Sequence, residues 1–167
     1  MEVLVTSFPD NYEKSWTISS PIRMCGVGLH SGENSEVNIF PSDKNGFYVS
    51  WDGSDEPPQR LQPNQIRESQ LCTSIEIGNH RLSTVEHLLG ALAGIGITHA
   101  IIKVSGKEIP LLDGSALLWV EAIKESGLKY IDEPRKPLIA LEKPLIFCRG
   151  ESVITATPCE NFSLIGI

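Results

Sequence analysis

The sequence predicts an α+β fold for most of the chain, followed by the start of a second, incomplete domain. Two observations indicate this class. Short segments with alternating or β-branched residues dominate the chain, and two segments have the apolar spacing of a helix. With 167 residues, 41% of them hydrophobic and 21% charged, the chain is long and apolar enough to build one ordinary domain around a core.

The predicted elements follow one another in a clear order. Residues 1–13 form a lead-in, and strands are predicted at 14–19, 36–40, 46–51, 71–77 and 98–104. The stretch DGSDEPPQRLQPNQ is rich in turn formers and is typical of a surface loop. Helices are predicted at 84–95 and 115–127, the second with Ser115 as its N-cap and Gly127 as its stop.

The composition of the sequence changes near residue 133. Two prolines and several charges at 133–137 indicate a linker, and short apolar segments (LIAL, LIFC, SVITAT and FSLIGI) follow it. A segment of about 30 residues cannot build a core of its own. These strands therefore either extend the first sheet or begin a second domain that the sequence does not complete, and the second interpretation is favoured.

Composition excludes several classes of protein. A net charge of −7 and a pI near 5.1 give no basic surface for nucleic acid. No apolar run approaches the roughly 20 residues of a transmembrane helix, and the first residues do not form a signal peptide. The four cysteines lack CxxC spacing and are interpreted as reduced thiols, and the histidines lack an HExxH motif.

Glu86 and His87 stand side by side at the start of an apolar helix, which is unusual because both side chains need partners when buried. Ser83 and Glu86 have the spacing of a capping box. The apolar stripe of Val85, Leu88, Leu89 and Leu92 would face the core, which leaves His87 on the opposite face with Gly90, Ala91 and Gly94.

Two interpretations of this pair remain open on spacing alone. In the first, Glu86 only caps the helix and His87 is a surface histidine. In the second, the imidazole binds zinc while the carboxylate takes a proton from water. A catalytic zinc normally has three protein ligands, however, and neither His80 nor His99 is obviously placed to supply another.

Three longer stretches carry a resemblance to a known family. They are MCGVGLHSGENSEVNIFP (24–41), LCTSIEIG with STVEHLLGALAGIGI (71–97), and EIPLLDGSALLWVEAIKESG (108–127). In this order they resemble the zinc-dependent UDP-3-O-acyl-N-acetylglucosamine deacetylases, which perform the committed step of lipid A synthesis. The resemblance implies two similar α+β domains, each a sheet with two helices on one face, with the active site between them. Residues 14–131 would then be the first domain, and 132–167 the linker and truncated start of the second.

The resemblance also implies roles for individual residues. His87 matches a Zn²⁺ ligand, and Glu86 matches the general base. Four residues, Leu29, His30, Leu71 and Cys72, match positions that line the substrate region, although Cys72 could equally be an inert packed thiol. Asp113 is expected to order the turn before the second helix.

The family's remaining zinc ligands belong to its second domain and have no counterpart in this sequence. The chain alone is therefore expected to bind zinc weakly or not at all and not to deacetylate its UDP-sugar substrate. The alternative is a non-catalytic truncated homologue that acts as a binding module. The resemblance implies a cytoplasmic setting, or an organelle of bacterial descent.

Overall fold

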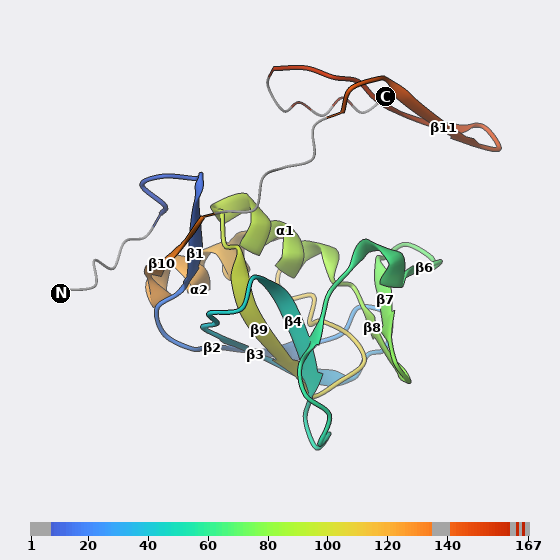
Figure 1. Cartoon of the computed structure of the whole chain (residues 1–167). Helices are drawn as coiled ribbons and strands as arrows, with labels where there is room; N and C mark the ends of the chain where they lie inside the picture. Colours follow the sequence, from blue (N-terminus) through green and yellow to red (C-terminus); the bar gives the residue numbers. More distant parts are fainter. Residues whose placement is uncertain (1–7, 135–140, 161–162, 164, 166–167) are drawn as a thin grey trace. The chain divides into compact units, whose positions relative to one another are not determined.

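The computed structural model describes residues 8–134, 141–160, 163 and 165. The chain divides into two compact units, Met1–Arg135 and Lys136–Ile167. Both α-helices of the described chain belong to the first unit (Figure 1). The α+β class predicted from the sequence is confirmed. No helix among the described residues is long and apolar enough to cross a membrane.

A five-stranded sheet forms the centre of the first unit, in the order β2-β3-β9-β4-β5. Its strands are β2 (Ile22–Val27), β3 (Asn34–Phe40), β4 (Gly46–Trp51), β5 (Gln59–Arg60) and β9 (His99–Val104). The central strand β9 pairs antiparallel with β3 and parallel with β4. Alternate residues such as Val37, Ile39, Ile102 and Val104 are buried, so one face of the sheet is turned to the core.

The two helices, α1 (Glu86–Ile95) and α2 (Leu117–Ser126), pack against each other and share one core with the sheet (Figure 1). Leu92 of α1, Trp119 of α2 and Ile102 of β9 are all fully buried in it. The core holds the start of α1 in a fixed place relative to the sheet, which matters because Glu86 is the first residue of that helix.

The predicted apolar stripe of α1 is confirmed for three residues, because Val85, Leu88 and Leu92 are buried and Leu89 is packed against the core. Ala91 is buried as well, so the prediction that it shares an outer face with His87 is wrong. The buried face of α1 therefore contains one residue more than the pattern indicated.

Two small sheets complete the first unit. The first pairs β1 (Lys14–Ile18) with β10 (Leu128–Pro134), which brings the two ends of the unit together. The second contains β6 (Ile66–Arg67), β7 (Ser74–Ile77) and β8 (His80–Ser83), and a short 3₁₀ helix, η1 (Pro63–Gln65), precedes it. The hairpin of β7 and β8 leads directly into α1, so this second sheet positions the helix start.

The second unit contains one described hairpin, formed by β11 (Leu145–Arg149) and β12 (Ser152–Ala156). Strands were predicted in both places, at LIFC and SVITAT. The predicted strand at LIAL falls largely, and that at FSLIGI mostly, outside the described residues. The large apolar side chains of the hairpin, such as Phe147 and Ile154, are exposed.

Candidate active site

The candidate site begins at Thr84, which links β8 to α1. Thr84 is 2% exposed and has φ 59°, in the left-handed region that a β-branched residue rarely adopts. Its hydroxyl donates a hydrogen bond of 2.8 Å to Oε1 of Glu108. The chain therefore turns sharply at Thr84, and the turn delivers Val85 and Glu86 to the start of the helix.

Glu86 does not form the predicted capping box. No side chain caps the start of α1, whose N-cap position is Val85. Ser83 lies instead at the end of β8, where its hydroxyl lies 2.9 Å from that of Ser74. Because the left-handed turn at Thr84 separates Ser83 from the helix, the serine cannot reach the helix amides. Glu86 is thereby free for another contact.

That contact is with the loop before β7. The backbone N–H of Thr73 donates to Oε2 of Glu86 at 3.0 Å, and the N–H of Val85 donates to the carbonyl of Thr73 at 3.3 Å. The other carboxylate oxygen, Oε1, lies 3.9 Å from Nε2 of His87, and both side chains remain partly exposed. One oxygen of Glu86 is thus anchored while the other faces the imidazole.

The LCT segment (71–73) contains the Thr73 amide of this contact and begins with a residue in a strained backbone conformation. Leu71 has φ 58° and its side chain is 94% exposed, so it contributes nothing to the core. This backbone also explains why the predicted strand at 71–77 begins only at Ser74. Strain at an exposed apolar residue is expected where function, not packing, selects the residue.

Cys72 follows with its thiol half-buried. Its Sγ lies 3.0 Å from Oγ of Ser69, within hydrogen-bond distance. Burial raises the pKa of the thiol, but hydrogen bonds from Ser69, Thr84 and Ser74 outweigh it and leave the pKa below its usual value. The thiol is therefore held in a polar setting, unlike a cysteine packed in an apolar core.

The glycine-rich GVGLHSG segment forms a tight loop between β2 and β3. The loop is closed by backbone hydrogen bonds from Gly28 to Glu33 and from Gly32 to Gly28. Its next contacts are to Glu108, whose Oε1 accepts from the N–H of His30 at 3.0 Å and whose Oε2 accepts from that of Ser31 at 2.8 Å. The side chain of Leu29 stays 56% exposed at the tip of the loop.

Glu108 is 3% exposed, yet it is ionised. Burial raises the pKa of its carboxyl group, but the hydrogen bonds from Ser31, His30 and Thr84 together lower it to about 2. A space with polar walls and a volume of about 370 Å³ lies next to this carboxylate. Its lining residues are His30, Ser31, Ser69, Gln70, Cys72, Ser83, Lys107 and Glu108.

The structure brings some of the sequence-predicted residues together and leaves others apart. His30 and Cys72 line the same pocket although 41 intervening residues separate them in the sequence. Leu29 and Leu71 are exposed and do not line it. Glu86 and His87 form a second group, joined to the pocket through Thr73, the residue after Cys72.

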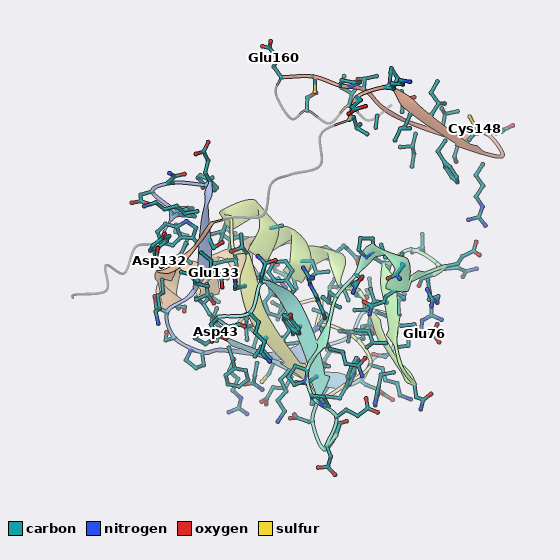
Figure 2. All side chains as sticks on the ribbon, viewed as in Figure 1. Asp43, Glu76, Asp132, Glu133, Cys148 and Glu160 are labelled. Atoms are coloured by element: carbon teal, nitrogen blue, oxygen red, sulfur yellow. The ribbon has the colours of Figure 1, made fainter. Side chains whose placement is uncertain are left out.

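The described residues do not form a complete metal site. No group of three or more histidine, cysteine, aspartate or glutamate side chains among them is placed to hold an ion. His80 stacks on Trp51 with ring centroids 4.4 Å apart, and His99 is buried with Nε2 3.9 Å from Glu133. Burial lowers the pKa of the His99 imidazole, and the carboxylates of Glu133 and Asp43, both labelled in Figure 2, act in the opposite direction. The donor set fits one ligand and one base of a zinc site, and no more.

Asp113 has the role predicted for it. Its Oδ1 accepts hydrogen bonds of 3.0 Å from the N–H and the hydroxyl of Ser115, and the hydroxyl of Ser115 accepts from the N–H of Leu117. The N-cap position of α2 is Ala116, and no side chain caps the helix. Ser115, the predicted N-cap, therefore lies one residue before that position. Gly127 ends the helix with φ 71°, as predicted.

Comparison with known proteins decides the family. A family model described as "LpxC: UDP-3-O-acyl N-acetylglycosamine deacetylase" matches residues 15–166. The chain belongs to this family.

Curated relatives agree with this assignment. The chain is 33% identical to the UDP-3-O-acyl-N-acetylglucosamine deacetylase of Cellvibrio japonicus over 153 residues, which cover 90% of this chain and 50% of that protein. It is 43% identical to the enzyme of the same name from Trichormus variabilis over 117 residues, 69% of this chain and 42% of that protein. A third, from Psychrobacter sp., is 34% identical over 90% of this chain and 51% of its own length. The chain spans about half the length of the curated relatives it matches.

Sequence reasoning missed Glu108 and Thr84. Glu108 could have been noticed as a charged residue that directly precedes the apolar run IPLL, because an unpaired carboxylate is costly to bury there. Thr84 gives no such signal, since nothing in its type or neighbours predicts a left-handed backbone.

Proposed function

We propose that this chain contributes the Glu86–His87 part of the active site of a zinc-dependent UDP-3-O-acyl-N-acetylglucosamine deacetylase. The observation that carries the proposal is the pairing of these two side chains at the first turn of α1. Glu86 is anchored through Oε2 to Thr73, and its Oε1 lies 3.9 Å from the His87 imidazole. Membership of the LpxC family and the names of the relatives support the substrate.

The proposed reaction is hydrolysis of the acetamide on the glucosamine. Glu86 Oε1 takes a proton from the attacking water, whose oxygen bonds to the acetyl carbon. The C–N bond then breaks, the proton passes to the nitrogen, and acetate and a free amine leave. The proton acceptor in this step is the carboxylate of Glu86, the first residue of α1. Zinc, when bound, supplies Lewis-acid polarisation of the reacting groups.

His87 is the residue that would hold zinc from this chain. An imidazole binds zinc through a ring nitrogen in its neutral form. A catalytic zinc normally has three protein ligands, which is two more than the described residues supply. We therefore expect the 167-residue chain by itself to bind zinc weakly and to release little acetate.

The pocket lined by His30 and Cys72 is the proposed place for the polar sugar part of the substrate. Its walls carry hydroxyl, amide, thiol and ammonium groups, which suit a hydroxyl-rich ligand better than an acyl chain. Leu29 and Leu71, exposed on either loop, would contact the substrate from outside the pocket. The proposed reaction takes place in the cytoplasm, or in an organelle of bacterial descent.

The test is acetate release from UDP-3-O-acyl-N-acetylglucosamine by the whole protein that contains this chain. Glu86→Gln is expected to lower kcat by ~100-fold or more, the usual loss for a general base. Glu76→Gln is the matched control, because Glu76 lies on β7 in an exposed pair with Arg67 (Figure 2). The proposal is rejected if kcat of Glu76→Gln falls as far as that of Glu86→Gln, or if the wild type shows no turnover. Absence of turnover in the wild type would favour a non-catalytic binding module.

A further inference from the structure

Glu108 connects the GVGLHSG loop of the candidate site to Thr84, at the turn before α1. The backbone on both sides of Glu108 is held by hydrogen bonds to Ser83. The N–H of Ser83 donates to the carbonyl of Lys107 at 2.9 Å, and the N–H of Ile109 donates to that of Ser83 at 3.0 Å. Glu108 and Ser83 thus pair as an isolated parallel bridge. The segment around Glu108 is attached to the last residue of β8, immediately before the turn at Thr84.

The Glu108 carboxylate accepts hydrogen bonds from the GVGLHSG loop and from Thr84. Oε1 accepts from the Thr84 hydroxyl and the His30 N–H, and Oε2 accepts from the Ser31 N–H, at distances of 2.8 to 3.0 Å. Charge-assisted hydrogen bonds of this kind are stronger than neutral ones. The packing is also tight, because a Cβ added to Gly28 would lie 2.4 Å from Oε2. One buried group therefore fixes the GVGLHSG loop relative to Thr84.

Thr84 needs such a partner. A left-handed backbone costs a non-glycine residue about 1–2 kcal/mol, so it persists only where the surroundings enforce it. At Thr84 the enforcing contacts are the hydroxyl bond to Glu108 on one side and the Val85–Thr73 backbone bond on the other. Two residues further on is Glu86, whose Oε2 holds the Thr73 amide. The orientation of Glu86 and His87 follows from the conformation of Thr84.

We propose that Glu108 is a positioning residue of the deacetylase site, which acts through the Thr84 hydroxyl to set the orientation of Glu86 and His87 relative to the loop that carries His30. This inference rests on the proposed function. Glu108 does not act on substrate itself, because both of its oxygens are occupied by donors from the chain. Its removal is expected to lower turnover in protein that is fully folded.

The variants separate positioning from folding. Glu108→Gln keeps the size of the side chain but loses the charge and one acceptor, and Thr84→Val keeps the shape of the threonine but loses its hydroxyl. Thr84→Ser keeps the hydroxyl and is the conservative rescue. In whole protein that circular dichroism shows to be folded, the first two variants are expected to lower kcat by about tenfold or more with little change in KM. Thr84→Ser is expected to stay within about threefold of the wild type.

A second readout does not depend on turnover. In ¹⁵N spectra of the 167-residue chain, Glu108→Gln and Thr84→Val are expected to shift the Thr73 amide and the His87 ring signals, and Thr84→Ser is expected to leave them in place. The proposal is overturned if only the His30 and Ser31 amides move, or if folded Glu108→Gln retains wild-type kcat. Should the wild type show no turnover, the proposed function fails, and the shifts of Thr73 and His87 still decide the role of Glu108.

Discussion

Acid should destabilise this protein through Glu108. In the folded chain the pKa of this carboxyl group is about 2, against a usual value of 4.5, because three donors hold it ionised in spite of burial. A group with a lowered folded pKa stabilises the protein fully above its unfolded pKa and loses that effect as the pH falls toward the folded value. The window for Glu108 is therefore pH 4.5 to about 2.

The size of the effect follows from the same two values. Each pKa unit corresponds to about 1.4 kcal/mol, so the interval from 4.5 to about 2 gives an upper value of about 3 kcal/mol in the free energy of unfolding. Most of this stabilisation should be lost between pH 4.5 and about 2. Because Glu108 is only 3% exposed, solvent screening reduces this figure little.

The assay is urea unfolding of the chain, followed by tryptophan fluorescence at several pH values. Glu108→Gln cannot titrate, so the stability gap between wild type and this variant should shrink by about 2–3 kcal/mol toward low pH. Glu36→Gln is the control. The pKa of Glu36 is also lowered to about 2, mainly by its hydrogen bond to Arg23, but its side chain is partly exposed. A gap between wild type and Glu108→Gln that stays constant with pH would refute the reasoning.

Five further substitutions test the packing of the site and the core. Leu71→Gly should raise the free energy of unfolding by about 0.5–1 kcal/mol, because φ 58° strains leucine, and it should weaken substrate binding. Leu29→Gly is the control and should not raise the free energy of unfolding, because Leu29 is exposed and lies outside the left-handed region. Gly28→Ala should destabilise the chain by more than about 1 kcal/mol because the new Cβ would overlap a buried carboxylate, whereas Gly90→Ala, with open space around it in α1, should stabilise it by about 0.5–1 kcal/mol. Trp119→Ala should cost about 3–5 kcal/mol in thermal or urea unfolding, since its ring is fully buried; a cost below about 1 kcal/mol would contradict the core as described.

Local pattern was enough to find the regular elements with strong periodicity. The helices at 86–95 and 117–126 lie inside the predicted ranges, and β4 matches its prediction at both ends. Five strands, β2, β5, β6, β8 and β10, were missed. β5 and β6 have only two residues each, β10 carries three charged residues, and no strand was predicted at β2 or β8. The pairing of β10 also depends on β1, at the other end of the first unit.

The candidate site was predictable only in part, for a similar reason. Motifs predicted Glu86, His87, His30 and Cys72 as site residues, but the contacts that orient them depend on tertiary structure. The capping box failed because the backbone reverses at Thr84, and no residue type signals that reversal. A buried carboxylate such as Glu108 is stable only once donors from two distant loops have assembled around it.

The central claim, that His87 holds a catalytic zinc beside Glu86, is tested most directly by zinc affinity of the whole protein measured together with acetate release. His87→Gln is predicted to weaken zinc binding by more than the ~10–100-fold typical of losing a neighbour of a ligand, and to lower turnover in parallel. His80→Gln, which removes an imidazole stacked on Trp51, should change neither. Wild-type zinc affinity and wild-type turnover in His87→Gln would contradict the account.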